Sequence, residues 1–112
     1  MNISRFDPKT AKRAHENTIL ASEVLPAGMK APFHHAWGYL TGKGEMELHA
    51  HPTHEVYFFF EGDGIMVLGD ERRAVTCGDV VDIPPDIMHT VANETDAPLL
   101  WAALWWMPEN EI

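Results

Sequence analysis

The chain has 112 residues, of which 46% are hydrophobic, so it is long enough for one domain with one core but not for two. Its 8 Lys and Arg residues against 17 Asp and Glu residues give a formal net charge of -9, which argues against nucleic acid and against an anionic membrane surface as partners. A bound cation can invert this field locally, so the charge leaves room for an anionic small substrate.

The first part of the sequence, residues 1–20, is predicted to be an N-terminal arm, and residues 21–112 a single domain. Asp7-Pro8 predicts a short surface helix, with Asp as its cap and Pro in its first turn. The opening residues lack the apolar core of a signal peptide, and no apolar run approaches the roughly 20 residues of a membrane span. We therefore expect a cytoplasmic protein.

From Ile19 onward, short apolar runs alternate with turn sequences. Predicted strands cover residues 19–25, 33–41, 45–51, 55–60, 64–68, 72–76, 80–83, 87–93 and 98–106. Many short strands at this spacing are typical of an antiparallel sandwich or barrel. Cys77, the only cysteine, excludes an intrachain disulfide and is expected to be a small core residue rather than a nucleophile.

The predicted strand 55–60 carries apolar side chains on both faces, because side chains alternate along a strand. Glu55, Tyr57 and Phe59 share one face, and His54 belongs to the other. The arm or a second subunit is expected to cover the outer face. Two packed sheets within one monomer would also bury both faces, but the four Trp residues of this short chain favour a homodimer.

Residues 49–55, HAHPTHE, concentrate side chains that bind metals or move protons. On a strand, His49 and His51 point the same way, roughly 6.6 Å apart. Glu55 keeps their parity after the interruption at Pro52. Two imidazoles and a carboxylate on one face can hold one ion. A lone His-x-His arises often by chance, and the alternative for each His is a hydrogen-bonded or exposed side chain.

Two longer motifs can be read in the chain, His49-x-His51-x3-Glu55-x6-Gly62 and Gly78-x5-Pro84-x-Asp86-x2-His89-x3-Asn93. Together they resemble the signatures of the cupin superfamily over roughly residues 33–106. Asp86 stands where the family usually has Gly, and Asp tolerates the left-handed backbone that such a turn can need. The glycine that usually precedes the first His would fall at Lys43, which Gly42 and Gly44 flank.

The resemblance implies an all-β double-stranded β-helix, in which two antiparallel sheets form a small jelly-roll barrel. By family position, the metal ligands would be His49, His51, Glu55 and His89. Three imidazoles and one carboxylate suit one divalent transition ion per chain, such as Mn, Fe, Co, Ni, Cu or Zn. On an octahedral ion this set would leave two adjacent positions open for water, substrate or oxygen.

Three further side chains are weak catalytic candidates. His54 stands where many relatives have a second acid; strand parity points it away from the metal, as an outer-face or interface residue, and a relay role would need Pro52 to distort the strand. His35 and Tyr39 share one face of strand 33–41, which family topology would place on the barrel wall, and one of them is a candidate to reach the cavity.

The last predicted strand contains three tryptophans, with Trp101 and Trp105 on one face and Trp106 on the other. Core filling or dimer contact is the expected use of these rings. A stacking platform for a sugar or aromatic ligand is the alternative.

The resemblance leaves three functions open. A metal-dependent enzyme would act on a small oxygenated molecule, such as a keto acid, enol, sugar derivative or catechol-like compound, by oxygenase, isomerase, decarboxylase or lyase chemistry. A sensor would bind a sugar or another small molecule with the metal as anchor, and a third possibility is a metal that only stabilises the barrel. Family analogy favours the enzyme, although a fold does not determine a function.

Overall fold

The computed structural model describes residues 1–112 and contains ten strands and one short helix. Their bounds are β1 Lys12–Ala14, β2 Ile19–Ser22, β3 His34–Leu40, β4 Gly44–Glu45, β5 His54–Glu61, β6 Asp63–Leu68, β7 Glu71–Thr76, β8 Val80–Ile83, β9 His89–Asn93, β10 Leu99–Trp106 and the 3-10 helix η1 Pro108–Asn110. None of the chain's helices is long and apolar enough to cross a bilayer.

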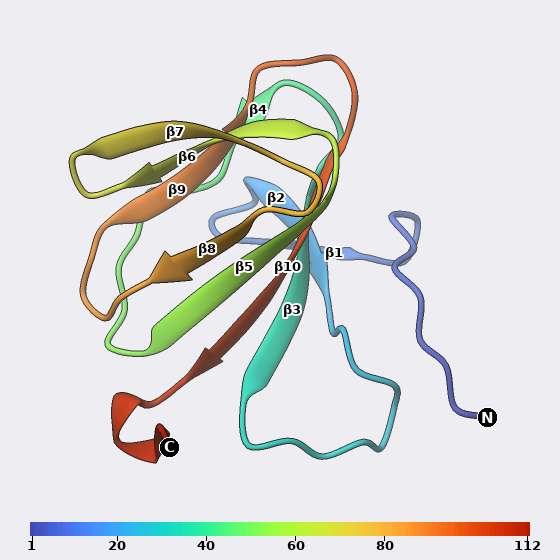
Figure 1. Ribbon diagram of the computed structural model, residues 1–112. Helices are drawn as coiled ribbons and strands as arrows, with labels where there is room; N and C mark the ends of the chain where they lie inside the picture. The colour runs from blue at the N-terminus through green and yellow to red at the C-terminus, as the bar shows by residue number, and fades with distance from the viewer.

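The strands form two antiparallel sheets that face each other (Figure 1). The six-stranded sheet has the order β1-β2-β3-β10-β5-β8, and the four-stranded sheet has the order β4-β9-β6-β7. This arrangement confirms the predicted all-β jelly roll. The sheets remain two separate hydrogen-bonded ladders rather than one closed barrel, and the site described below lies between them.

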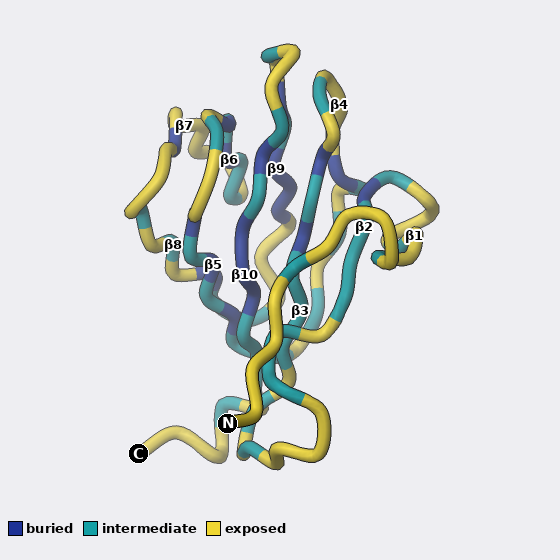
Figure 2. Tube along the Cα trace, turned by 90° about the vertical axis from the view of Figure 1, so that its right-hand side faces the viewer, coloured by how far each residue is buried: buried dark blue, intermediate teal, exposed yellow.

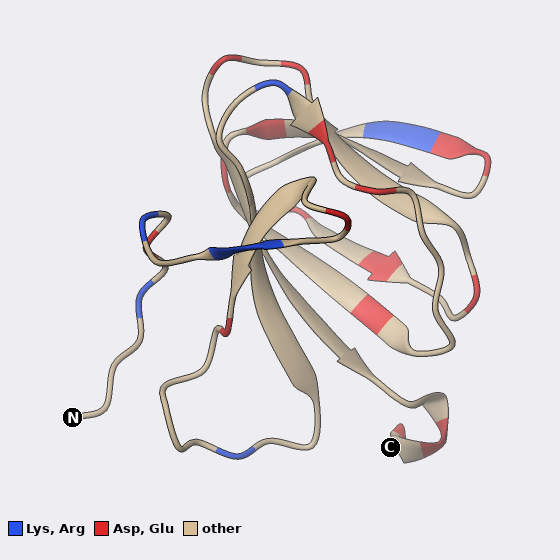
Figure 3. Cartoon of the chain, turned by 180° about the vertical axis from the view of Figure 1, so that it is seen from behind, with Lys and Arg blue, Asp and Glu red and all other residues tan.

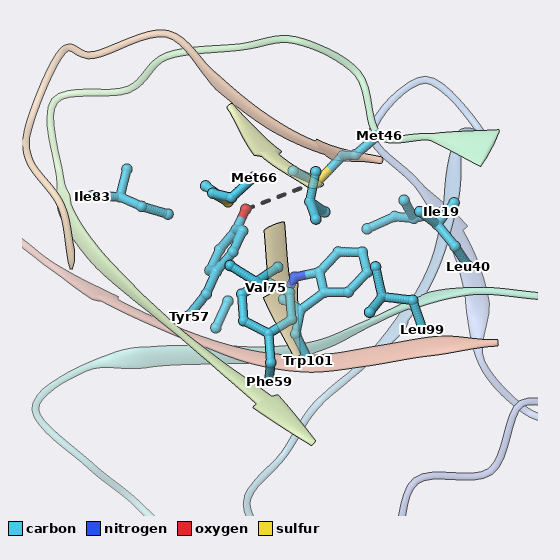
Figure 4. Close-up of a cluster of buried hydrophobic side chains, with 12 residues drawn as sticks. Ile19, Leu40, Met46, Tyr57, Phe59, Met66, Val75, Ile83, Leu99 and Trp101 are labelled. Carbon is cyan, nitrogen blue, oxygen red and sulfur yellow. Dashed lines mark hydrogen bonds between the residues drawn. The ribbon is translucent and has the colours of Figure 1, made fainter. Parts of the chain in front are cut away.

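The core fills the space between the sheets, because alternation turns one face of each strand inward. Buried residues follow β5, β9 and β10 through the molecule (Figure 2). The core cluster, drawn in Figure 4, comprises Ile19, Leu40, Met46, Tyr57, Phe59, Met66, Val75, Ile83, Val91, Leu99, Trp101 and Ala103. Trp101 lies against β3 at Gly38, where an added Cβ would come within 2.6 Å of the indole Nε1. Only glycine therefore fits at that point of β3.

The predicted helix at Asp7-Pro8 is wrong. Thr10 N and Ala11 N both donate to Asp7 O, which closes a single turn, and Lys9 N donates to the Asp7 carboxylate at 2.9 Å. The chain then extends into β1, inside the predicted arm, and Lys12 pairs with Ala21 of β2. Pairing with a neighbouring strand satisfies the backbone here, so the local cap motif does not propagate into a helix.

Two other expectations need correction. The predicted strand 45–51 is a strand only at Gly44–Glu45, and the rest is irregular apart from an isolated bridge between His49 and His89. Cys77 is exposed rather than buried, because it lies in the turn between β7 and β8. Gly78, with φ of +95°, reverses the chain in that turn, so Cys77 does not continue the inward alternation of β7.

The second motif forms the turn that leads into β9. Asp86 has φ of +66°, as expected for a residue that replaces a motif glycine. Its backbone N–H donates to His51 O at 2.8 Å, so this turn is tied to the first motif. Asn93, at the end of the motif, is buried and its amide donates to Ala97 O at 2.7 Å. The residues of the second motif therefore stabilise the fold in addition to any role at a metal.

Candidate metal centre

The four residues predicted as ligands come together between the two sheets. One ligand atom from each of His49, His51, Glu55 and His89 lies within 4.8 Å of the others. His49 and His89 are held by the isolated bridge, in which His89 N donates to His49 O at 2.9 Å and His49 N donates back at 3.2 Å. Glu55 points inward from β5 and is only 6% exposed. Residues from irregular chain, β5 and β9 thus converge on one point.

Each of the three imidazoles is oriented by a backbone carbonyl. The Nδ1 atom lies 2.7 Å from Glu47 O in His49, 3.1 Å from Thr53 O in His51 and 2.9 Å from Ile87 O in His89. A carbonyl oxygen only accepts, so Nδ1 of His49 and of His89 carries the proton and donates it, whereas Nδ1 of His51 also lies 2.8 Å from the Thr53 hydroxyl, which can donate to it. The lone pair of His49 and of His89 is then on Nε2, which is the arrangement that metal-ligating histidines use.

The arrangement of the cluster fits a bound cation at its centre. Nε2 of His51 lies 2.9 Å from Glu55 Oε1, a distance that fits either a direct hydrogen bond or a shared ion. His89 Nε2 is 3.3 Å from the same oxygen, is fully buried and has no hydrogen-bond partner. Buried polar atoms rarely lack a partner, and an ion is one explanation for those that do. The donor set therefore fits a cation.

Burial also favours the neutral form of His49, which is the form that can bind a metal. Removal of His49 from solvent lowers its pKa, and the nearby His89 and His15 add to this effect, against its hydrogen bond with Glu47 O and the charge of Glu55. A lower pKa keeps the imidazole neutral to more acidic pH. Neutral imidazole nitrogen and carboxylate oxygen suit Mn, Fe, Co, Ni, Cu or Zn, whereas Ca and Mg prefer oxygen ligands alone.

A cavity of about 470 Å³ opens next to the cluster. Sixteen residues line it and none is Lys or Arg: Ala14, His15, Ile19, Ala21, Ala36, Trp37, Gly38, Met46, His49, His51, Thr53, Glu55, Tyr57, Trp101, Ala103 and Trp105. Ten of them are hydrophobic, so the wall apart from the cluster is mainly aliphatic and aromatic. A second cavity, of about 300 Å³ along β6, β7 and β8, contains no histidine.

Tyr57 extends into this region beside Trp101 (Figure 4). Its hydroxyl donates to Met46 Sδ at 3.8 Å, a weak hydrogen bond. Burial, together with the negative charge of Glu55, raises the pKa of Tyr57 well above its usual value. The phenol is therefore neutral at physiological pH and can act as a hydrogen-bond donor but not as a base.

The three candidate catalytic residues lie outside the cavity. Nδ1 of His35 accepts from Val24 N at 3.0 Å, and the ring of Tyr39 packs on Phe6 with centroids 5.0 Å apart. The contact of Gly38 with Trp101 turns the even-numbered face of β3 inward, so His35 and Tyr39 point outward.

His54 also faces away from the cluster, between two carboxylates. Its Nε2 lies 2.6 Å from Asp82 Oδ1, and its Nδ1 lies 2.5 Å from Glu111 Oε2. The hydrogen bond with Asp82, followed by the one with Glu111, raises the His54 pKa. The Trp106 indole donates to the same Glu111 oxygen at 2.8 Å, so His54 helps to hold the C-terminal segment on the outer face.

Sequence reasoning missed His15. It belongs to the turn between β1 and β2, lines the cavity, and has its ring centroid 4.4 Å from that of His49. The predicted arm gave no reason to place it there. The one available signal was a histidine in an otherwise polar segment just before the first apolar run.

Comparisons with known proteins agree with this architecture. The family described as "Cupin domain" matches residues 36–107. An uncharacterised protein of Methanocaldococcus jannaschii is 42% identical over 81 residues, which are 71% of this chain and 53% of that protein. The chain therefore spans about half the length of this curated relative.

Two solved structures resemble the chain along nearly its whole length. A Cupin 2 conserved barrel domain protein from Salinispora arenicola has a TM-score of 0.84 and 27% identity, covering 97% of this chain and 91% of that one. The plu4264 protein from Photorhabdus luminescens has a TM-score of 0.83 and 29% identity, with the same coverage. Both similarities extend across the two sheets and the region between them.

Proposed function

Because the chain belongs to the cupin-domain family, we propose that it binds one divalent transition metal ion through His49, His51, Glu55 and His89 and acts as a metal-dependent enzyme on a small oxygenated organic molecule. When bound, the ion would supply Lewis-acid or oxygen-activating chemistry. The chain itself supplies the orientation of the ligands and a water-poor cavity beside them.

The observation that carries the metal site is the common orientation of the three imidazoles. Each has Nδ1 within 3.1 Å of a backbone carbonyl and contributes one ligand atom to the cluster with Glu55, whose Oε1 lies 2.9 Å from His51 Nε2 and 3.3 Å from His89 Nε2. Carbonyl partners of this kind fix the tautomer and the ring plane of metal-ligating histidines. Histidines that only stabilised the fold would have no reason to share this arrangement.

The cavity supports a small ligand with oxygen atoms at one end and an apolar body. No Lys or Arg lines the cavity, so a bound carboxylate or enolate would have to place its charge on the ion. The walls formed by Ile19, Trp101 and Trp105 would exclude water from the rest of the molecule. Keto acids, enols and catechol-like compounds have this distribution of polar and apolar groups, and sugar derivatives share its oxygen-rich end.

The metal site is tested by titrating metal-free protein with Co(II), Mn(II), Fe(II), Ni(II) and Zn(II). We expect one ion per chain, and at least a 10–100-fold loss of affinity in His51→Ala. His34→Ala, which removes an exposed histidine of β3, is the matched control and should bind like the wild type. Failure of the wild-type protein to bind any of these ions at neutral pH would refute the proposal.

A binding module is the second candidate, and one observation favours it. His35, Tyr39 and His54 all lie outside the cavity, so none of the three is available as a general base there. A panel of oxo acids, diketones, catechols and sugars, tested with each metal in air and without air, separates the two. Turnover that is lost in folded His49→Ala supports the enzyme, and saturable binding of one compound without turnover supports the sensor.

We also propose a homodimer formed through the outer face of the six-stranded sheet. The arm covers only part of this face, where Phe6 packs on Trp37 and Tyr39. On β5 and β8, Phe60 and Val80 remain 52% and 58% exposed. Apolar side chains exposed together mark protein interfaces.

Light scattering at micromolar concentration tests this assembly. The wild-type protein should give the mass of a dimer, and Phe60→Asp should shift it toward the monomer. Met29→Asp changes an equally exposed side chain in the segment between β2 and β3 and should leave the dimer intact. A wild-type protein with the mass of a monomer would contradict the proposal.

A further inference from the structure

The turn between β1 and β2 holds three consecutive residues in a left-handed conformation. His15, Glu16 and Asn17 have φ of +52°, +56° and +64°, and none of them is glycine. This conformation costs roughly 1–2 kcal/mol per L-residue, although His and Asn adopt it more readily than most. Backbone strain of this kind persists where the surroundings hold it, and it is concentrated at functional sites.

Thr18 fastens this turn to the segment that carries the metal ligands. Its hydroxyl donates to His15 O at 2.6 Å and accepts from Glu47 N at 2.9 Å. The side chain of His15 is thereby presented to the mouth of the cavity, where its ring packs against that of His49. Its Nδ1 lies 3.8 Å from Glu47 Oε1.

His15, Glu47 and His49 form a second group with the chemistry of a metal site. One ligand atom from each lies within 4.8 Å of the other two. The side chains of His15 and Glu47 are 37% and 34% exposed, so a hydrated ion can reach them. Two imidazoles and a carboxylate suit the same ions as the buried set. We call these three residues the outer set, and His49, His51, Glu55 and His89 the inner set.

Exposure falls from the outer set to the inner set. Glu55 is 6% exposed and His89 is fully buried, so an ion from solvent cannot meet them first. His49 belongs to both sets, and its Nδ1 is engaged with Glu47 O, which leaves one nitrogen for a metal. His49 can therefore serve an ion in either set but not in both at once, and it is the one ligand that an ion would keep in moving from the outer set to the inner set.

We propose that the outer set is an uptake site, at which a divalent transition ion first binds before it passes to the inner set through His49. This inference rests on the proposed metal centre. In the transfer, the oxygen of Glu47, the nitrogen of His15 and one water of the hydrated ion would leave, and His51, Glu55 and His89 would take their places. No electron is transferred, and the neutral imidazoles exchange as lone-pair donors.

The charge of the surrounding surface favours this route. The chain has a net charge of -9, and acidic residues occur both in the β1–β2 turn and in the segment after β4 (Figure 3). Glu16 and Glu47 lie in these two segments. Lys12 and Arg13 of β1 precede this turn, so the attraction for a cation comes from the net charge of the chain and from Glu47 in the outer set itself.

Stopped-flow uptake of Co(II) by metal-free protein, followed by its visible absorption, tests the proposal. We expect the association rate constant to fall about tenfold in Glu47→Gln, at the low end of the effect of local charge on such rates, and to fall in His15→Asn because one of the three ligands of the outer set is lost, with Kd changed by no more than about twofold in both. Release into excess chelator should slow by the same factor, because a site on the path but not in the final complex affects both directions equally.

The variants are chosen to keep the turn folded. Asn tolerates the left-handed backbone of position 15, and Gln matches the shape of Glu47. Glu16→Gln is the control: like Glu47→Gln it removes one negative charge, but from a side chain outside the outer set, so its rate should fall by less than that of Glu47→Gln and stay within about twofold of wild type. Thermal unfolding of each metal-free variant confirms that the fold is intact.

Four results would overturn the proposal. Uptake rates in His15→Asn and Glu47→Gln equal to wild type would exclude the outer set from the path. A loss of affinity with an unchanged association rate would make His15 a ligand of the final ion, and unchanged uptake with weaker binding of a small molecule to the loaded protein would assign the pair to the ligand site. Wild-type protein that binds no Co(II) would refute the metal centre itself.

Discussion

Replacement of Gly38 by Ala tests the packing that closes the cavity. The new Cβ would lie 2.6 Å from Nε1 of Trp101 and still closer to its Cε2 and Cζ2. Non-bonded heavy atoms normally stay about 3.5–4.0 Å apart, so the indole has to move by about 1 Å. Its neighbours leave little room, because the rings of Tyr57 and Phe59 have centroids 5.9 Å and 6.3 Å from that of Trp101.

The size of the effect follows from two opposing contributions. Overpacking of a core costs about 1–3 kcal/mol. Alanine also restricts the unfolded chain more than glycine does, and this effect offsets about 0.4–1 kcal/mol of the cost. We therefore expect Gly38→Ala to reduce the free energy of unfolding by about 1–2 kcal/mol, which corresponds to a Tm lower by roughly 5–10 °C.

Urea denaturation followed by tryptophan fluorescence measures this change. Gly42→Ala is the matched control, since its Cβ would lie 3.5 Å from Asp96 O, an ordinary contact, and its stability should stay within about 0.5 kcal/mol of wild type. In a Trp101→Phe background, which lacks the crowded part of the indole, Gly38→Ala should cost much less. If Gly38→Ala unfolds at the wild-type urea concentration, or costs the same in both backgrounds, the contact with Trp101 is not what requires glycine.

Three other measurements test the site and the fold. Metal affinity should fall as the pH drops below about 6, because imidazoles bind metals only when neutral. His49 should resist protonation longest, because burial lowers its pKa. An affinity that calorimetry finds constant down to about pH 5 would contradict the ligand set. The hydrogen bond with Asp82 raises the pKa of His54 in the folded protein, so the stability that His54 contributes is complete below its unfolded pKa of 6.5 and is lost as the pH rises through the folded pKa. His54→Asn should therefore lower Tm more at about pH 5.5 than at about pH 8.5. An equal loss at both pH values would be inconsistent with this. Asn93→Ala removes an amide whose oxygen accepts from Thr95 N at 2.9 Å, and urea denaturation should show a loss of about 1–3 kcal/mol; wild-type stability would show that this buried network is dispensable.

The sequence predicted the centre of the molecule better than its periphery. The two motifs named His49, His51, Glu55 and His89, and the structure brings these four together. Parity along strand 55–60 also placed Glu55 inward and His54 outward, as observed. Both inferences use the two-residue period of a strand, which is a local property and is readable without knowledge of the partners.

The faces of β3 could not be read in the same way. Alternation showed that His35 and Tyr39 share a face, but not which face turns inward. The packing of Trp101 on Gly38 decides that, and Trp101 comes from β10, the neighbouring strand in the sheet. The direction of a strand's face depends on its partners, so both candidates pointed away from the cavity for a reason outside their own segment.

The sequence by itself determined the all-β class, the order of the two motifs and the residue types available for a metal, because strand periodicity and turn chemistry act over a few residues. Only the tertiary structure decided that the segment after Asp7 pairs as β1, that Thr18 ties the β1–β2 turn to Glu47, and that His15 meets His49 at the mouth of the cavity. These contacts join segments far apart in the chain. Their free energy comes from closing the two sheets on a common core, and no local pattern of residues records it.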